Sequence, residues 1–300
     1  MSATAPETIR QYLEARRLRV DQELEKLLPA PKEYPPSIHQ AMRHSVFAGG
    51  KRLRPILCWE SGQLFSGEEK TLLHVGCALE MIHTYSLIHD DLPALDNDDL
   101  RRGKPTCHRA YGEATAILAG DALLTLAFEV LSAPGLLPAR RSLRIVHEIS
   151  HAIGTHGGMV GGQVVDVETT GYQTDASTLE YIHRAKTGAF ICAAVRSGAL
   201  CADAAKEDLA RVTTYGEKVG LAFQIADDLL DVTGSKEQLG KSVGKDDQQH
   251  KATYPAIHGV EESRRIASQL VREACAVLEP YGSRAQRLRE IAHFLVERNN

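Results

Sequence analysis

The chain has 300 residues, of which 43% are hydrophobic, and a formal net charge of −4 at pH 7. This length and composition suffice for a substantial buried core. The lack of a basic excess and an aromatic content of 5% argue against a nucleic-acid-binding surface. Six cysteines without a C-x-x-C pair indicate free thiols in a reducing, cytoplasmic setting. No uncharged apolar run reaches the about 20 residues that a membrane span needs, so we expect none.

Apolar residues at helical spacing dominate the chain from end to end. They predict helices at 7–28, 37–48, 56–65, 71–92, 114–131, 139–170, 177–201, 206–234, 260–279 and 283–297. The helix at 71–92 is nearly apolar all round and is expected to be central. Pro93 should end it, which leaves Asp96 and its neighbours in the following loop.

No segment alternates with period two over enough residues to predict a sheet. We therefore expect an all-α fold, a single domain over residues 1–300 with about ten helices around a central cavity. The interval 154–162 contains five glycines, which cost roughly 1 kcal/mol each inside a helix. Close approach by another helix or by a ligand is the usual reason to tolerate them.

Two acidic clusters each follow an apolar helical run. The first holds five aspartates between residues 90 and 99, and the second holds Asp227, Asp228 and Asp231 on one helical face. So many neighbouring carboxylates repel one another unless cations compensate them. Two such clusters predict two walls of one metal-lined cavity.

Cations stand near these acids along the chain. The turn GGKRLRP places Lys51, Arg52 and Arg54 within four residues, after two glycines that permit a tight bend. Mg²⁺ takes one or two protein carboxylates and completes its shell with water and substrate phosphate. Facing aspartates with cations nearby are therefore typical of a site that holds a diphosphate through bridging metal ions.

A collinear series of motifs covers nearly the whole chain. It runs GGKRLRP, EMIHTYSLIHDDLPALDNDDLRRGKPT, GDALL, GGQVVD, HRAKTGA, FQIADDLLD and GKSVGKDDQQHKATYP. On these motifs the chain resembles the trans-prenyl diphosphate synthase (polyprenyl synthetase) family, and within it the bacterial farnesyl diphosphate synthases. The resemblance implies the isoprenoid synthase fold, a homodimer, and Mg²⁺-dependent condensation of isopentenyl diphosphate with dimethylallyl and geranyl diphosphate.

The resemblance also implies a role for individual residues, by their place in the motifs. The metal ligands, for about three Mg²⁺ ions with Mn²⁺ as a possible substitute, would be Asp90, Asp91, Asp96, Asp227, Asp228 and Asp231. The isopentenyl diphosphate contacts would be Gly50, Lys51, Arg54, His83 and Arg102. The allylic diphosphate contacts would be Arg101, Lys186, Thr187, Gln224, Lys241 and Lys251. Of these, Lys186, Thr187 and Gln224 would also stabilise the developing allylic cation.

The length of the prenyl product is the most specific expectation. In the family, the residues four and five positions before the first aspartate floor the pocket for the growing tail, and here they are Ser86 and Tyr85. Five helical residues span about 7.5 Å, so a tyrosine at 85 should stop a longer tail below the metal site. This predicts the C15 product, (2E,6E)-farnesyl diphosphate.

Three alternatives stay open. A geranylgeranyl diphosphate synthase would use the same site with a deeper pocket. A class I terpene cyclase shares the aspartate-rich motif, but its second metal motif usually mixes Asn, Ser or Thr with Glu, unlike DDLLD. A non-catalytic prenyl synthase subunit typically lacks aspartates from one motif, whereas both are complete here.

Overall fold

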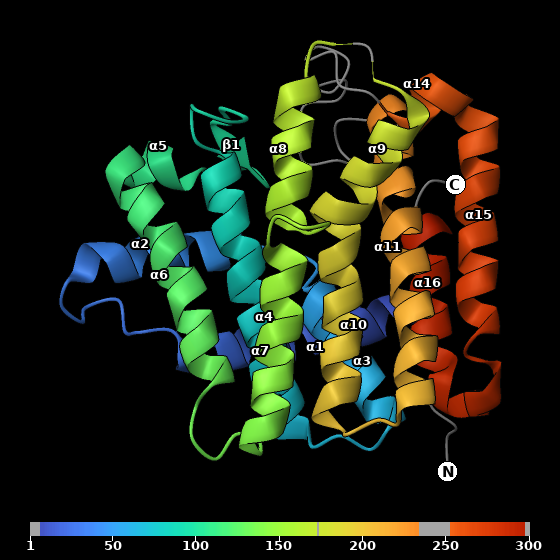
Figure 1. Cartoon of the computed structure of the whole chain (residues 1–300). Coiled ribbons are helices and arrows are strands. Elements are labelled where there is room, and N and C mark those ends of the chain that lie inside the picture. The colour runs from blue at the N-terminus through green and yellow to red at the C-terminus, as the bar shows by residue number, and fades with distance from the viewer. Residues whose placement is uncertain (1–6, 173, 234–252, 298–300) are drawn as a thin grey trace.

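The computed structural model describes residues 7–172, 174–233 and 253–297, which are almost entirely helical (Figure 1). The first half contains α1 (Ile9–Leu27), α2 (Pro36–Val46), α3 (Leu53–Leu64), α4 (Glu69–Asp90), β1 (Leu100–Arg101), β2 (Lys104–Pro105), α5 (Cys107–Tyr111), α6 (Glu113–Leu131) and α7 (Ala139–Ile153). The second half contains α8 (Met159–Thr169), α9 (Ala176–Ile182), η1 (His183–Gly188), α10 (Ala189–Cys201), α11 (Lys206–Thr233), α14 (Tyr254–His258), α15 (Val260–Ala276), η2 (Glu279–Ala285) and α16 (Gln286–Glu297). The predicted all-α fold is confirmed.

Most predicted helix ends fall within a few residues of the observed ones, because local signals set them. Thr8 and Gln11 form a capping box at the start of α1, and Asp175 caps α9 by accepting from the Thr178 N–H. The predicted helix at 139–170 is two helices, α7 and α8, separated by the glycines near residue 157. Within the described ranges, the short helices α5, α9 and α14, of five to seven residues each, were not predicted as separate elements.

The antiparallel pair β1 and β2 was not predicted. Each strand has two residues, with Leu100 opposite Pro105 and Arg101 opposite Lys104. Two residues are too few for a period-two pattern to be visible in a sequence.

Helix α4 lies in the centre of the bundle, as its apolar sequence predicts. It packs against α6, α3 and α1, and its Leu79, Met81 and Ile82 are fully buried. The C-terminal ends of α4 and α11 lie at the same end of the bundle (Figure 1). This common direction brings the two acidic clusters to one rim.

Glycines allow several helices to cross at very short range. A Cβ on Gly198 of α10 would lie 2.0 Å from the Cys58 carbonyl oxygen of α3, and one on Gly220 of α11 would lie 2.8 Å from the Cα of Gly188. Neither position could accept a larger residue without a backbone shift. These crossings fix α10 against α3 and α11 against η1.

Length and hydropathy alone would let α6 cross a membrane, and it is the single helix of the described ranges for which this holds. A core helix has the same composition, and α6 packs along α4 and α2. Leu123 and Ala127 are fully buried, whereas Ile117 and Leu118 are 45% and 58% exposed. One apolar face of α6 is thus left uncovered.

Candidate active site

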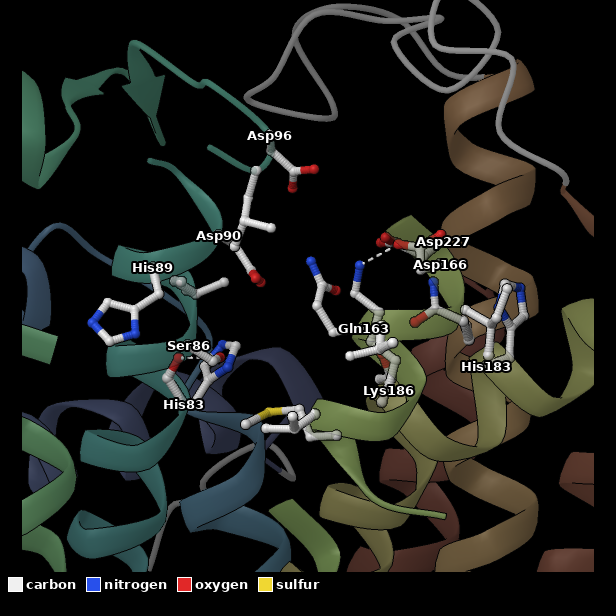
Figure 2. Close-up of a pocket in the computed structure, with 18 of the residues that line it drawn as sticks. His83, Ser86, His89, Asp90, Asp96, Gln163, Asp166, His183, Lys186 and Asp227 are labelled. Carbon is white, nitrogen blue, oxygen red and sulfur yellow. Dashed lines mark hydrogen bonds and ion pairs between the residues drawn. The ribbon is translucent and has the colours of Figure 1, made fainter. Parts of the chain in front are cut away.

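A cavity of about 540 Å³ opens between α4, α8, η1 and α11. Figure 2 shows Asp90 and Asp96 on one side of it and Asp227, Asp166 and Lys186 on the other. The prediction of two acidic walls facing one cavity is confirmed in this arrangement.

The first acidic wall is the end of α4 and the loop after it. Asp90 is the last residue of α4, and the backbone N–H of Asp96 donates to the Asp90 carbonyl at 2.8 Å. The N–H of Asp98 donates in turn to the Asp91 carbonyl at 3.1 Å. These bonds fold the loop back over the helix end, so that Asp90 and Asp96 both line the cavity although six positions separate them.

Asp91 has a different environment from its neighbour Asp90. It is only 3% exposed and accepts from Arg101 Nε at 2.8 and 3.0 Å and from Arg101 Nη2 at 2.5 Å. Burial lowers the pKa of Arg101, but the hydrogen bond to Asp91 and the negative charges of Asp91, Asp98 and Asp90 together outweigh it, so the arginine pKa is raised. Asp91 therefore ties β1 to the end of α4 instead of lining the cavity.

The second acidic wall lies on α11, and one of its carboxylates is paired within the protein. Asp227, Asp228 and Asp231 all line the cavity, although Asp228 is only 5% exposed. Asp228 Oδ2 lies 2.8 Å from His183 Nε2 and accepts the backbone N–H of Tyr254 at 2.9 Å. The carboxylate thus joins α11 to η1 and to the first residue of α14.

The charge balance of the first wall calls for a cation. Burial raises the pKa of Asp90 to about 6; the carboxylates of Asp96 and Asp91 act in the same direction, and Lys186 opposes them. Among the described residues, no three His, Cys, Asp or Glu side chains gather closely enough to enclose a metal ion. Pairs of carboxylates on opposite walls suit Mg²⁺, which prefers oxygen ligands and takes the remainder from water and phosphate.

Lys186 and Thr187 lie on η1, a π-helical segment, and Gln224 lies on α11; all three line the cavity. π-Helical turns are frequently found at functional sites. The Lys186 ammonium is 2.6 Å from Asp166 Oδ2 of α8. The sequence prediction missed Asp166 and the neighbouring Gln163, although both belong to GGQVVD, where the glycine pair indicated a close approach.

That close approach is confirmed at Gly162. A Cβ there would lie 2.3 Å from the backbone nitrogen of Lys186, so α8 touches η1 directly. The fit holds Asp166 against the Lys186 ammonium.

The predicted tight turn at the start of GGKRLRP is also confirmed. Gly49 and Gly50 have φ angles of +106° and +137°, which favour glycine. Arg102 donates to the Gly49 carbonyl, and a Cβ at residue 50 would lie 2.5 Å from Arg102 Nη1. The glycines let the guanidinium lie across the turn, and Lys51 follows on an exposed position.

Arg54 and His83 also line the cavity. Burial lowers the pKa of Arg54 to about 10. Burial also lowers the pKa of His83 well below its ordinary value, and the positive charges of Arg54 and Arg102 act in the same direction. His83 is thus neutral at pH 7, able to donate one hydrogen bond. The Arg54 guanidinium stacks over Phe190 at 5.1 Å, and its Nε has no hydrogen-bond partner in the described part of the chain.

Arg52 lies between Lys51 and Arg54 in the sequence and has a role that the sequence did not reveal. It is 3% exposed and has a left-handed backbone with φ +50°. Its guanidinium donates to Asp21 at 2.7 Å, to Glu80 at 2.8 Å and to the Val46 carbonyl at 2.6 Å. This buried network fixes the turn between α1, α2 and α4.

Tyr85 and Ser86 line the cavity below Asp90. Tyr85 is 8% exposed, and its ring meets that of His89 edge to face at 5.8 Å. Its position agrees with a floor of the cavity. Two further predicted contacts, Lys241 and Lys251, lie outside the described residues.

Comparison with known proteins gives a consistent result. The sequence profile of the family "Polyprenyl synthetase" matches residues 35–286. The chain is 50% identical over 292 residues to a dimethylallyltranstransferase of Fischerella ambigua, covering 96% of this chain and 83% of that protein. It is 48% identical over 291 residues to a geranylgeranyl diphosphate synthase of Cyanophora paradoxa, covering 96% of each.

Solved structures agree with the sequences. An FPP/GFPP synthase from Zymomonas mobilis superposes with a TM-score of 0.86 at 39% identity, covering 96% of this chain and 98% of that one. A geranyltransferase from Legionella pneumophila gives 0.86 at 36% identity, covering 97% and 98%. With its two acidic walls, its basic turn and its helical bundle, the chain belongs to the polyprenyl synthetase family.

Proposed function

We propose that this prenyltransferase, which elongates prenyl diphosphates, condenses isopentenyl diphosphate with dimethylallyl and then geranyl diphosphate and releases (2E,6E)-farnesyl diphosphate and pyrophosphate. The observation that supports it is a single cavity with aspartates on facing walls and Tyr85 below them. The carboxylates mark the diphosphate end, and the tyrosine limits the room for the tail.

Asp90 and Asp96 on one wall and Asp227 and Asp231 on the other are the residues that we expect to hold Mg²⁺. Asp228, which also lines the cavity, belongs to the same proposed ligand set and is oriented by His183. Asp91, predicted as a ligand from the motif, instead pairs with Arg101. Bound Mg²⁺ would neutralise the allylic diphosphate and so favour its departure as pyrophosphate. About three ions agree with the family, and Mn²⁺ is a chemically reasonable substitute.

The chain's own groups bind and orient the two substrates. The Lys186 ammonium, held by Asp166, and Arg101, which also lines the cavity, face the allylic diphosphate. Thr187 and Gln224 present polar groups to the allylic carbons. Their fixed dipoles stabilise positive charge without reorganisation.

The second diphosphate belongs at the basic turn. Gly50, Lys51, Arg54, His83 and Arg102 form the isopentenyl diphosphate site in this proposal. Of these, Arg54 and the neutral His83 line the cavity. A buried guanidinium with an unused N–H is a strong donor for an anionic oxygen.

Tyr85 with Ser86 favours a C15 product. Geranylgeranyl diphosphate synthesis is the second candidate, because several relatives, including the one from Cyanophora paradoxa, carry that name. The buried tyrosine below Asp90 favours the shorter product over that alternative.

The test is a product assay with purified protein, Mg²⁺, labelled isopentenyl diphosphate and either dimethylallyl or geranyl diphosphate, with chain length resolved after dephosphorylation. A dominant C15 alcohol supports the proposal. A C20 alcohol keeps the reaction and rejects the role of Tyr85. No Mg²⁺-dependent product, or full turnover by Asp90→Ala or Asp227→Ala, contradicts the catalytic assignment.

We also propose that the enzyme is a cytoplasmic homodimer. The exposed Ile117 and Leu118 of α6, with Leu143 at 70% exposure on the neighbouring α7, form an apolar face that a second copy would cover. All six cysteines are free, which suits a reducing compartment. Light scattering after size-exclusion chromatography should give the mass of a dimer, and Leu118→Glu should shift it to that of a monomer.

A further inference from the structure

Gln163 of α8 lies in the middle of the wall opposite Asp90. It is three residues before Asp166, so the two side chains share a helix face, and both line the cavity. Figure 2 shows the end of Gln163 between Asp90 and Lys186. The family resemblance assigned no role to this residue.

The backbone at Gln163 is fixed relative to the predicted cation-stabilising groups. The preceding Gly162 packs so closely on η1 that a Cβ would be 2.3 Å from the Lys186 nitrogen and 2.8 Å from its Cα. The Asp166–Lys186 ion pair, at 2.6 Å, fastens the same two elements one turn further on. The backbone that carries Gln163 is thus held in place by contacts on both sides.

The carbonyl oxygen of that amide is unpaired. Gln163 Oε1 is buried and has no hydrogen-bond partner within the described ranges. A buried acceptor without a partner destabilises the folded state and calls for an explanation. A positive charge supplied by a ligand would complete this group.

The substrates limit what can supply that charge. A diphosphate offers only acceptor oxygens, and a prenyl tail offers no polar group, so neither complements a carbonyl oxygen in the ground state. When the allylic C1–O bond breaks, its electron pair leaves with pyrophosphate and positive charge spreads over C1 and C3. A fixed carbonyl dipole in a wall away from water stabilises such charge.

We propose that Gln163 is a further catalytic residue, whose side-chain carbonyl faces the allylic cation. The inference rests on the proposed function. The electrons of the isopentenyl double bond then form the new C–C bond to C1, and the isopentenyl carbon C2 loses its proton to the departed pyrophosphate. Gln163 exchanges no atoms in these steps and acts through its dipole.

The experiment compares Gln163→Leu and Gln163→Glu with the wild type in single-turnover reactions of geranyl and isopentenyl diphosphates at saturation. Leucine removes the dipole, so we expect C–C bond formation to slow by about 10²-fold, with KM for geranyl diphosphate changed less than about 3-fold. Glutamate keeps an acceptor oxygen in the same place, so the step should slow less than with leucine, while KM rises through repulsion of the diphosphate. Melting temperatures show that both variants are folded.

Gln286→Leu is the matched control, because its amide is exposed at the start of α16 and donates to Glu290. It should leave both constants unchanged. A single-turnover rate for Gln163→Leu within 3-fold of wild type overturns the inference, as does a slower step with glutamate than with leucine, which would mean that the amide N–H binds the diphosphate. If the wild type forms no prenyl product at all, the proposed function fails instead.

Discussion

Asp90 and Asp91 are adjacent in the sequence, yet their replacement by asparagine should change stability in opposite directions. Asp90 lines the cavity, and burial raises its pKa from 3.8 to about 6. Asp91 is 3% exposed and paired with Arg101. The Asp90 carboxylate destabilises the fold when it is charged, whereas the Asp91 carboxylate must be charged to pair with Arg101.

The size of the effect at Asp90 follows from proton linkage. Between pH 4 and pH 6 the folded chain retains a proton that the unfolded chain has released, so stability falls as the pH rises through this interval. A pKa raised by about two units lowers the free energy of unfolding by about 3 kcal/mol above pH 6, as an upper bound. Without Mg²⁺, Asp90→Asn should therefore raise Tm at pH 8 by up to about 6 °C, at about 2 °C per kcal/mol for a chain of this size. At pH 4 the gain should nearly vanish.

Asp91→Asn should have the reverse result. It leaves the buried guanidinium of Arg101 without its charged partner, which costs about 3–5 kcal/mol. We would measure thermal unfolding of both variants in EDTA from pH 4 to pH 8, together with prenyl transfer in Mg²⁺, which Asp90→Asn should abolish despite its stability. Equal losses of Tm in the two variants, or a gain in Asp90→Asn that is independent of pH, would refute the reasoning.

Three further outcomes are expected. Tyr85→Ala should lengthen the main product from C15 toward C20, because a further isoprene unit buries about five carbons at about 0.8 kcal/mol each. Tyr172→Ala is the control, because this tyrosine is 74% exposed. An unchanged product profile in Tyr85→Ala would exclude its role as the floor of the cavity. Gly162→Ala should lower the free energy of unfolding by about 1–3 kcal/mol and slow turnover, because its Cβ would overlap backbone atoms of Lys186; a wild-type melting curve would show that α8 can move away. Chelation by EDTA should stop product formation and excess Mg²⁺ should restore it, whereas activity that persists in EDTA would contradict the metal requirement.

Much of the fold could be predicted because its signals are local. Apolar spacing located the long helices, and Pro93 correctly placed the end of α4 just before it. The sequence could not show where the predicted helix at 139–170 divides. Each glycine destabilises a helix, but this cost does not show which glycines end the helix and which pack against another element. Gly162 meets the Lys186 backbone, 24 positions away, and that meeting exists only in the folded bundle.

The acidic motifs show the same limit within the site. Successive residues on a helix point about 100° apart, so the two carboxylates of an Asp-Asp pair meet different neighbours. On α4 the second aspartate turns to Arg101, ten positions on, and on α11 it turns to His183, 45 positions back. Sequence identifies the pairs but not these partners, which come from other elements. Under the proposed function, each pair thus combines a carboxylate for Mg²⁺ with an anchor that holds its helix end, and this explains why two adjacent acids of the same type need different tests.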